Sequence, residues 1–386
     1  MSEFMGKAGF QWFVGVVEDR SDPKTLGRLR VRCLGYHTEG LDKLPTADLP
    51  WAHVMNPITS ATVSGLGQTP LGAVEGTWVV GFFQDGSDAQ QPIIIGTLPG
   101  VPSELPDTGS KKGFMDTING AYPKYKDETD VNRLAVNDED LPHSTLTIRK
   151  ADLTTKIGRA DFNEVDLGVA NSREGTITLP SDDGLEFNEP ETPYASEYPY
   201  NHVYESEAGH LREMDDTPGK ERIHERHSSG SGYEIHPDGS KVTRVKQDNY
   251  TITTNDDFVH VKGNSNTTVD GGVRVFVNAD GSTDDHNYTI QVGNNANVNI
   301  QVDKGDVNVV TSQGDINLKS GKNIHMDATQ GIYMKSKLVS AEIDGNWVET
   351  TQNKTESTGT HIMNATLQDI NGASEVDIDG GTINLN

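Results

Sequence analysis

The sequence has little cysteine and no long apolar run. Its one cysteine, Cys33, rules out a disulfide within the chain, and its place in an alternating apolar pattern predicts a small core residue rather than a nucleophile. The longest uncharged apolar stretches, Trp78–Phe83 and Pro92–Leu98, are far too short to span a bilayer. Because the first ten residues lack the apolar region of a signal peptide, we expect synthesis in the cytoplasm without an export signal.

Positive charge is also scarce. The 386 residues carry 58 acidic and 32 basic side chains, a formal net charge of −26 at pH 7. An acidic surface repels nucleic acid and anionic membranes, so we expect neither as an electrostatic partner. With 33% hydrophobic residues and 40 glycines, and a mean hydropathy of −0.58, the composition favours an extended molecule over a compact globule.

Proline is absent from Tyr250 to Asn386, and a short apolar pattern repeats through that stretch. Each unit holds two apolar residues separated by one other, so both side chains point to one face of a strand. Glycines with Asn, Asp, Ser and Lys lie between the pairs, as in tight turns every eight or nine residues. The clearest pairs are Val298 with Ile300, Val307 with Val309, Ile316 with Leu318, Ile324 with Met326, and Ile332 with Met334. This repeat is typical of a β-solenoid or β-helix.

The shortage of aromatic residues in the repeats bears on the number of chains. Residues 251–386 hold only Phe258, Phe276, Tyr288, Tyr333 and Trp347. One apolar pair per unit cannot enclose a core, whereas three chains that each supply one face of a prism can. The lack of proline agrees, because a strand bonded on both sides needs every N–H group. The sequence therefore predicts an intertwined, homotrimeric, triple-stranded β-helix whose core contains the ten paired residues.

The first hundred residues predict a separate β domain. We expect strands at Trp12–Glu18, Leu26–Leu34, Trp51–Met55, Thr77–Phe83 and Pro92–Thr97. Five strands with Gly-rich links suit a small barrel of the OB type. The second strand alternates apolar and basic residues, namely Leu29, Val31 and Cys33 with Arg28, Arg30 and Arg32. No ladder of aromatic residues accompanies these arginines, so we expect them to be solvated or to contact another subunit, and not to bind nucleic acid.

Motifs in three parts of the chain resemble one family. Trp12–His37 reads WFVGVVEDRSDPKTLGRLRVRCLGYH, and EGTWVVGFF and QPIIIG follow it at Glu75–Phe83 and Gln91–Gly96. GFMD at 113–116 and DVNRLA at 130–135 lie in the next part. The third part runs from Tyr200 to Ser240 and contains YNHVYESEAGH, EMDDTPGKERIH and EIHPDGS. Together they resemble the central, cell-puncturing spikes of contractile phage tails, a family that includes T-even spikes and the VgrG spikes of type VI secretion.

The resemblance implies an all-β organisation in four parts. These are an OB-fold domain at 1–100, an extended connector with short β elements at 101–197, a collar at 198–249 and the β-helix spike at 250–386. In the connector, β elements are expected at Ser144–Ile157 and Thr176–Leu179. In the collar, the turns at Asp215–Gly219 and Pro237–Gly239 are expected to reverse the chain in a short meander.

The resemblance also implies a function. The chain would be a structural spike of the virion's tail baseplate that punctures the host outer membrane when the sheath contracts. T-even spikes carry a lysozyme domain between barrel and β-helix, an insertion that needs on the order of 160 residues with helical periodicity and two carboxylates. The connector here is shorter, rich in proline and without that periodicity. We therefore expect no enzymatic activity and no cofactor.

Two alternatives stay open. One is a VgrG-type spike of a type VI secretion or related contractile injection system, although the sequence starts at the barrel without the hub domains of VgrG. The other is a trimeric β-helical receptor-binding fibre or polysaccharide depolymerase. That protein would need longer coils and an aromatic-lined groove, which the aromatic-poor repeats do not offer.

Few residues are candidates for binding. One chain cannot hold an ion with both His224 and His227, because residues i and i+3 of a strand face opposite sides. A threefold axis could bring three copies of one histidine together, so both are weak candidates for an ion on that axis. Ile383, Leu385 and Asn386 are expected to hold a separate tip protein of the PAAR-repeat type, which would cover the open strand edges of the prism. The barrel is expected to face a trimeric hub protein of the baseplate, and the host outer membrane is a transient contact.

Overall fold

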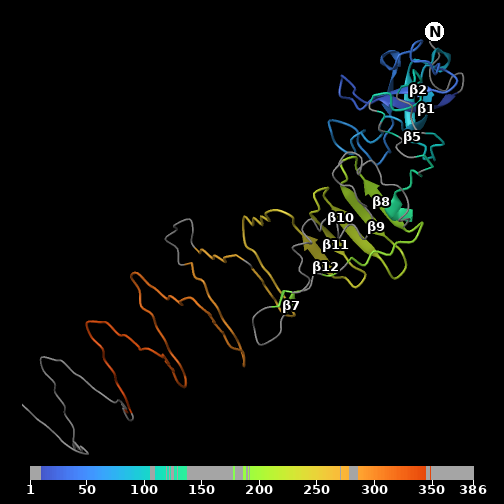
Figure 1. Ribbon diagram of the computed structural model, residues 1–386. Coiled ribbons are helices and arrows are strands. Elements are labelled where there is room, and N and C mark those ends of the chain that lie inside the picture. The colour runs from blue at the N-terminus through green and yellow to red at the C-terminus, as the bar shows by residue number, and fades with distance from the viewer. Residues whose placement is uncertain are drawn as a thin grey trace, which may run out of the picture. The chain divides into compact units, whose positions relative to one another are not determined.

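The computed structural model describes most of the chain outside the connector and the C-terminal end. The described residues are 10–104, 109–118, 120, 122, 126–127, 129–136, 177–178, 186–187, 190, 192–269, 271–277, 286–344 and 348. Two units are distinguished, Met1–Val275 and Phe276–Asn386, and the first holds all the strands assigned in the described part (Figure 1). Among the described residues, no helix is both long and apolar enough to cross a membrane.

Five strands close into a barrel in the order β1-β2-β3-β5-β4. They are β1 Gln11–Asp19, β2 Leu29–Cys33, β3 Trp51–Val54, β4 Trp78–Phe83 and β5 Pro92–Thr97. Neighbours are antiparallel except β3 and β5, which are parallel. Short 3-10 turns, η1 Thr46–Asp48 and η2 Gly86–Asp88, lie in two of the links. The predicted OB-like barrel is confirmed, and each predicted strand forms with its ends shifted by at most three residues.

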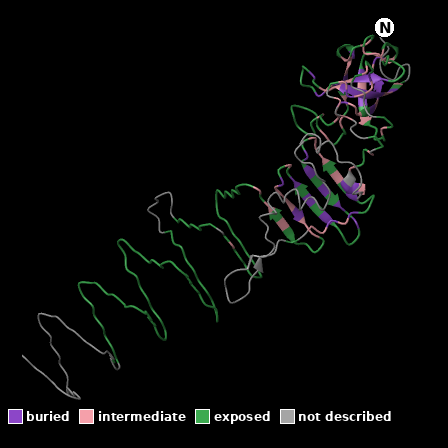
Figure 2. Ribbon diagram, viewed as in Figure 1, coloured by how far each residue is buried: buried purple, intermediate pink, exposed green. Residues whose placement is uncertain are grey.

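Alternation along the strands fills the barrel with apolar side chains. The buried cluster consists of Phe13, Val17, Leu29, Val31, Cys33, Ala52, Val79, Phe83 and Ile94. Figure 2 shows this burial in purple. Burial also raises the pKa of the Cys33 thiol to about 12, so the thiol is protonated and unreactive at neutral pH. The prediction that Cys33 is a core residue is confirmed.

The prediction for Arg32 is wrong, because its side chain is wholly buried rather than solvated or in contact with another subunit. Arg32 donates to both carboxylate oxygens of Glu18, at 2.7 and 3.1 Å. Its remaining N–H groups reach the backbone carbonyls of Thr38 at 2.6 Å and Leu44 at 2.8 Å. A guanidinium can be buried here because a carboxylate and two carbonyls replace the water it loses.

The other two arginines of the stripe also bind within the chain. Their guanidinium carbons lie over the ring of Trp51, 5.5 Å from its centre for Arg28 and 4.6 Å for Arg30. Arg28 pairs with Asp22 at 2.7 Å and lowers the pKa of that carboxyl below its usual range. Their side chains are only 14% and 17% exposed, so the alternation with apolar residues did not indicate a solvated face.

The start of the connector closes the barrel over the Glu18–Arg32 pair. The backbone N–H of Phe114 donates to Oε1 of Glu18 at 2.7 Å, and the N–H of Gly113 donates to the carbonyl of Glu39 at 2.7 Å. A Cβ on Gly113 would stand 2.1 Å from Nε of Arg32. Only glycine therefore lets the connector lie this close to the buried pair.

Two short elements are assigned in the described parts of the connector beyond this contact. One is the single helical turn α1, Arg133–Val136. The other is a two-stranded ribbon in which β6 Ile177–Thr178 pairs antiparallel with β7 Glu186–Phe187. The β element expected at Thr176–Leu179 corresponds to β6, whereas the one expected at Ser144–Ile157 lies outside the described residues.

The collar is an antiparallel meander of five strands in sequence order. They are β8 Asn201–Glu205, β9 Leu211–Asp215, β10 Arg222–Arg226, β11 Gly232–Ile235 and β12 Lys241–Arg244. Gly219, with φ 74°, lies between β9 and β10, and Gly239, with φ 85°, lies between β11 and β12. These glycines stand in the two turns expected from the sequence, so the predicted meander is confirmed.

The repeat region of the single chain is extended and uncovered. Among the described residues after Arg244, no strand forms, and the one turn assigned lies at 294–295. Bends recur at 303–305, 312–314, 321–322 and 329–330, which fall between the apolar pairs. Nearly all the described residues here are exposed, as the mostly green trace of Figure 2 shows. The β-helix prediction concerns three chains together, and one chain alone does not form it.

The ten paired residues predicted for the core of the β-helix are not buried in the single chain. The first residues of the pairs are between 52% and 59% exposed, and they are Val298, Val307, Ile316, Ile324 and Ile332. The second residues are between 68% and 75% exposed, and they are Ile300, Val309, Leu318, Met326 and Met334. Each pair lies open in the single chain, because one apolar pair per unit has nothing to pack against in its own chain. Their burial in a trimer stays a prediction.

Candidate functional site

The inner face of the collar sheet is polar, although it is buried. Its side chains alternate with exposed ones along the two central strands, and they are Leu211, Glu213 and Asp215 of β9 and Arg222, His224 and Arg226 of β10. The register places Asp215 opposite Arg222 and Glu213 opposite His224. His224 in turn lies opposite Glu234 of β11. Acidic and basic groups therefore face each other across three neighbouring strands.

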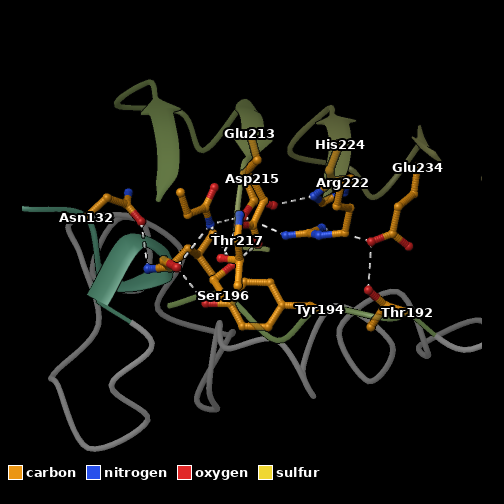
Figure 3. Close-up of polar contacts among 12 residues, drawn as sticks. Asn132, Thr192, Tyr194, Ser196, Glu213, Asp215, Thr217, Arg222, His224 and Glu234 are labelled. Carbon is orange, nitrogen blue, oxygen red and sulfur yellow. Dashed lines mark hydrogen bonds and ion pairs between the residues drawn. The ribbon is translucent and has the colours of Figure 1, made fainter. Parts of the chain in front are cut away.

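Glu213 is the centre of this polar network (Figure 3). Its Oε1 accepts hydrogen bonds from Arg222 at 2.8 Å and from the Asn201 amide at 2.9 Å, and its Oε2 lies 2.6 Å from Nδ1 of His224. Arg222 also donates to Glu234 at 2.8 Å. Burial of Glu213 opposes its ionisation, but the hydrogen bond with His224 and the charge of Arg222 outweigh burial and lower the pKa to about 2. Glu213 is therefore a buried anion at neutral pH.

Hydrogen bonds tie a connector segment, Thr192–Glu197, to this face. The Ser196 hydroxyl donates to one carboxylate oxygen of Asp215. The other oxygen accepts the backbone N–H of Thr217 at 3.0 Å and its hydroxyl at 2.6 Å. At the start of the segment, the hydroxyl of Thr192 donates to the carboxylate of Glu234 at 2.7 Å. The segment thus follows the inner face and excludes water from it.

Tyr194 and helix α1 complete the cover. The ring of Tyr194 lies 4.8 Å from the guanidinium carbon of Arg222, and its hydroxyl donates to the carbonyl of Leu134 at 2.6 Å. Burial raises the pKa of this hydroxyl to about 12. The Asn201 amide donates to the same carbonyl at 3.1 Å, and Leu134, Tyr194 and Leu211 form a small apolar cluster. Helix α1 is therefore anchored on the collar by both polar and apolar contacts.

The arrangement suits a structural role better than catalysis. A histidine beside a carboxylate can act as an acid–base pair, but His224 is 2% exposed and lies under the connector segment. A substrate could reach it only if the cover opened. Within the described part of the chain, no three His, Cys, Asp or Glu side chains are grouped so as to hold a metal ion. We interpret the network as a polar core that fixes connector and sheet together.

The structure does not bring the two histidine candidates together. His224 belongs to the buried network, whereas His227 follows β10 and is exposed. The ring of His227 lies against that of His210, with 4.4 Å between ring centres, and its Nδ1 accepts the N–H of Ser229 at 3.1 Å. An ion on a threefold axis would involve three chains, and that site stays a prediction.

A second polar contact joins the collar to the barrel. Arg20, which follows β1, donates to both oxygens of Glu207 in the turn after β8, at 2.7 and 3.0 Å. Glu75 lies 3.2 Å from Nε of Arg20, and the hydroxyl of Tyr122 donates to Glu207 at 2.9 Å. Nearby, the amide of Asn132 donates to Glu205 at 2.7 Å. The barrel, the connector and the collar meet at this contact.

The outer face of the collar sheet carries an uncovered apolar row. Met214 of β9 pairs with Ile223 of β10, and Ile223 pairs with Ile235 of β11. Met214 and Ile223 are each 45% exposed. A buried polar face and a partly apolar exposed face reverse the arrangement expected for a sheet in a single soluble chain.

The remaining predicted site residues form no site in the described part of the chain. The ten core candidates of the repeats are uncovered, as described above, and Ile383, Leu385 and Asn386 lie outside the described residues. Sequence reasoning missed the polar network. The only signal was the charged alternation in Leu211–Asp215 and Arg222–Arg226, which a usual amphipathic interpretation assigns to a solvated face.

The closed five-stranded barrel places the chain among proteins built on an OB-like fold. A family model described as the Gp5 N-terminal OB domain matches residues 37–183, from the link after β2 into the connector. Protein Gp5 of Vibrio phage KVP40 is 39% identical over 301 residues, which cover 71% of this chain and 66% of that protein. The pre-baseplate central spike protein Gp5 of Enterobacteria phage T4 is 24% identical over an alignment of 464 positions, which takes in 70% of this chain and 80% of that protein.

The chain belongs to the Gp5-like central spike proteins of T4-like phages. The predicted family is confirmed, and its T4 member is named a pre-baseplate central spike protein, which supports the predicted spike role in the virion. The chain spans just under two thirds of the length of the Vibrio phage protein. Neither relative is named as a secretion-system spike or as a receptor-binding fibre.

Proposed function

We propose that the chain assembles as a homotrimer whose residues 250–386 form a triple-stranded β-helix. The uncovered repeats carry this proposal. In one chain the ten paired apolar residues are more than half exposed, and the described backbone after Arg244 forms no strand. Two further copies would supply both a core and strand partners.

Magnitudes support assembly over an isolated extended chain. Burying one aliphatic side chain stabilises a protein by about 1.5–3 kcal/mol, and a whole domain is stable by only about 5–15 kcal/mol. Leaving ten such residues exposed therefore forgoes more free energy than a domain normally has. The outer row of Met214, Ile223 and Ile235 supports the same assembly, because it lies on the collar sheet that leads into the repeats.

A matched pair of substitutions tests the trimer. Ile316→Asp would place three carboxylates in the proposed core, whereas Asn317→Asp adds the same charge at the neighbouring, outward position. We expect Ile316→Asp to block assembly, because a buried unpaired charge costs several kcal/mol, and Asn317→Asp to leave the trimer intact. Analytical ultracentrifugation measures both. A folded wild-type monomer, or trimers of both variants, would contradict the proposal.

We propose further that the trimer is a passive needle pushed through the host outer membrane by the contracting sheath. At about 4.8 Å per unit, roughly sixteen units of eight or nine residues give a shaft on the order of 75–80 Å. Strands bonded on both sides would make such a shaft stiff, because bending it would break many hydrogen bonds together. Puncturing can be tested by adding purified trimer, under applied force, to vesicles made from outer-membrane lipids.

The hub protein of the baseplate is proposed to bind the barrel at the end away from the collar. That end carries an aromatic cluster in which Phe10 and Trp12 contact Phe82 at 5.3 and 5.7 Å between ring centres. Phe10, Trp12 and Tyr36 are 49%, 54% and 43% exposed. Exposed aromatic clusters are typical of protein interfaces. Trp12→Asp should abolish capture of the trimer by hub complexes, whereas Lys112→Asp on another exposed site should not.

The chain is proposed to act without a lysozyme domain of its own. The alignment with the T4 protein takes in 464 positions but only 70% of this chain, about 270 residues, so roughly 190 positions of that relative have no counterpart here. This supports the absence of a large inserted domain. Peptidoglycan cleavage would then need another protein, and a zymogram of the purified trimer should show no clearing.

The tip proposal rests on the sequence pattern alone. Ile383, Leu385 and Asn386 continue the strand pattern of the repeats, and a PAAR-type protein seated on three copies would cover their edges. Deleting residues 381–386 should leave a trimer that no longer retains the tip protein. Retention by the shortened trimer would contradict this contact.

A further inference from the structure

The link between β3 and β4 contains a long loop without charge. From Met55 to Val74, twenty residues carry no Asp, Glu, Lys, Arg or His, although 23% of the whole chain is charged. Five apolar side chains of this uncharged loop are at least half exposed, namely Met55 at 51%, Ile58 at 102%, Val63 at 57%, Leu66 at 65% and Leu71 at 69%. Such a concentration of uncovered apolar residues is typical of an interaction surface.

The uncharged loop has a shape fixed by its own polar groups. The Asn56 amide donates to the Thr62 hydroxyl at 3.1 Å and to the Gln68 carbonyl at 3.0 Å. The Ser60 hydroxyl accepts the N–H of Gln68 at 2.7 Å. Gly67, with φ 91°, lets the chain pass so close that a Cβ there would stand 2.5 Å from the Ser60 hydroxyl. Because the polar groups satisfy one another and the apolar side chains point outward, the loop is pre-organised for an apolar partner.

The uncharged loop lies at the collar end of the barrel. Glu75 follows the loop directly and pairs with Arg20, which holds Glu207 of the collar. Pro70 packs against Gly27 in the link between β1 and β2, which joins the same end of the barrel. The aromatic cluster proposed for the hub lies at the opposite strand ends, at the start of β1 and the end of β4. The loop is therefore not part of that hub surface.

We propose that the uncharged loop docks on a neighbouring copy of this chain, next to the collar, as part of the trimer proposed above, on which it rests. Each copy carries a net charge of −26, so copies repel one another over most of their surface. A loop without charge is where they can approach with least repulsion. The partner surface has the same chemistry, because the nearby collar exposes Met214 and Ile223, with the partly buried Ile235 beside them in the same row.

Single thiols on the full-length protein test the contact. The native Cys33 is buried and its thiol is unreactive, so it does not interfere. Leu66→Cys places a thiol on the uncharged loop, and Gln90→Cys places one on an exposed site near the opposite barrel end. In the isolated trimer, without any other protein, we expect maleimide to label the thiol in Leu66→Cys at least about tenfold more slowly than the thiol in Gln90→Cys. Mild urea that dissociates the trimer should remove the difference.

The labelling rates and the oligomeric state together separate the loop contact from the trimer itself. Equal labelling rates in a trimer confirmed by sedimentation would overturn the loop contact alone and would leave the β-helix trimer standing. A monomeric wild-type chain would overturn both proposals. As a second readout, Leu66→Asp should leave the barrel folded, because the side chain is outside its core, and should lower the urea concentration at which the trimer dissociates. An unchanged dissociation midpoint would also contradict the contact.

Discussion

Single residues decide whether charge can be buried in this chain. Arg32 is stable inside the barrel because Glu18 and two carbonyls surround it, and Gly113 leaves room for the connector backbone to bring one more N–H group to Glu18. Glu213 is stable in the collar for the same reason, because contacts with Arg222, His224 and Asn201 replace the hydrogen bonds that its carboxylate would make to water. In both sites the connector supplies part of the cover, so the connector is as much a part of the fold as the strands.

Gly113→Ala tests the first of these sites. The new Cβ would stand 2.1 Å from Nε of Arg32 and 2.7 Å from Oε1 of Glu18. We expect a loss of about 3 kcal/mol in the free energy of unfolding of the barrel, because the connector must move away and leave the ion pair less well bonded. Gly100→Ala is the control, since its Cβ meets nothing within 4 Å. Urea unfolding followed by tryptophan fluorescence measures both, and equal midpoints would contradict the expectation.

Acid should weaken the collar through Glu213. The pKa of this carboxyl is about 2 in the folded chain, against 4.5 for its ordinary value. A lowered pKa contributes stability above pH 4.5 that is lost as the pH falls toward 2, by about 3 kcal/mol in all. Tyrosine near-ultraviolet circular dichroism during urea unfolding, at pH 6 and pH 3, measures the loss. Glu213→Gln should be less stable at pH 6 and should lose less on acidification; an equal loss in both proteins would refute the assignment.

At the scale of elements, the collar sheet depends on Arg222 to join two acidic side chains. Arg222→Met would leave Glu213 and Glu234 buried without their cation, which costs about 3–5 kcal/mol. Arg212→Met makes the same change on the exposed face of the sheet and should cost less than about 0.5 kcal/mol. We expect hydrogen exchange in residues 192–217 to accelerate in the first variant only. Equal protection in both variants would show that the network does not hold the connector segment.

The contact between barrel and collar should behave as a modest ion pair. Arg20 and Glu207 form two hydrogen bonds, but each side chain is 32% exposed, so solvent screens part of their attraction. A double-mutant cycle with Arg20→Ala and Glu207→Ala should give a coupling energy of about 1 kcal/mol that falls at high salt. A coupling of zero would mean that Tyr122 and Asn132 hold the collar without this pair.

The predictability of these elements follows from how local their signals are. The barrel strands could be predicted because Leu29, Val31 and Cys33 alternate in a pattern that a half-buried strand requires, and the collar turns because Gly219 and Gly239 supply positive φ. The polar core could not, since charged residues at alternate positions normally indicate solvent. The carboxylates of both polar sites take hydrogen bonds from other segments, from Phe114 to Glu18 and from Asn201 to Glu213, and no local pattern reveals these bonds.

For the whole molecule, the chain divides into a part that closes on itself and a part that does not. The barrel encloses Phe13, Val17 and Val31 within one chain, whereas the repeats leave Ile316 and Ile324 more than half exposed. A structure closed within one chain is stable at any dilution. A structure closed only by other copies gains stability with concentration.

The stability of the two parts should therefore respond differently to dilution. In the proposed trimer, the urea midpoint of the repeats should rise with total chain concentration, because three chains must meet to bury one core, whereas the midpoint of the barrel should stay constant. In a Trp347→Phe background, tryptophan fluorescence follows the barrel through Trp12, Trp51 and Trp78, and hydrogen exchange across residues 286–344 follows the repeats. A hundredfold dilution series separates the two responses. If the repeats unfold at one midpoint throughout that series, with exchange as slow at the lowest concentration as at the highest, their protection comes from within a single chain and the intertwined trimer is wrong.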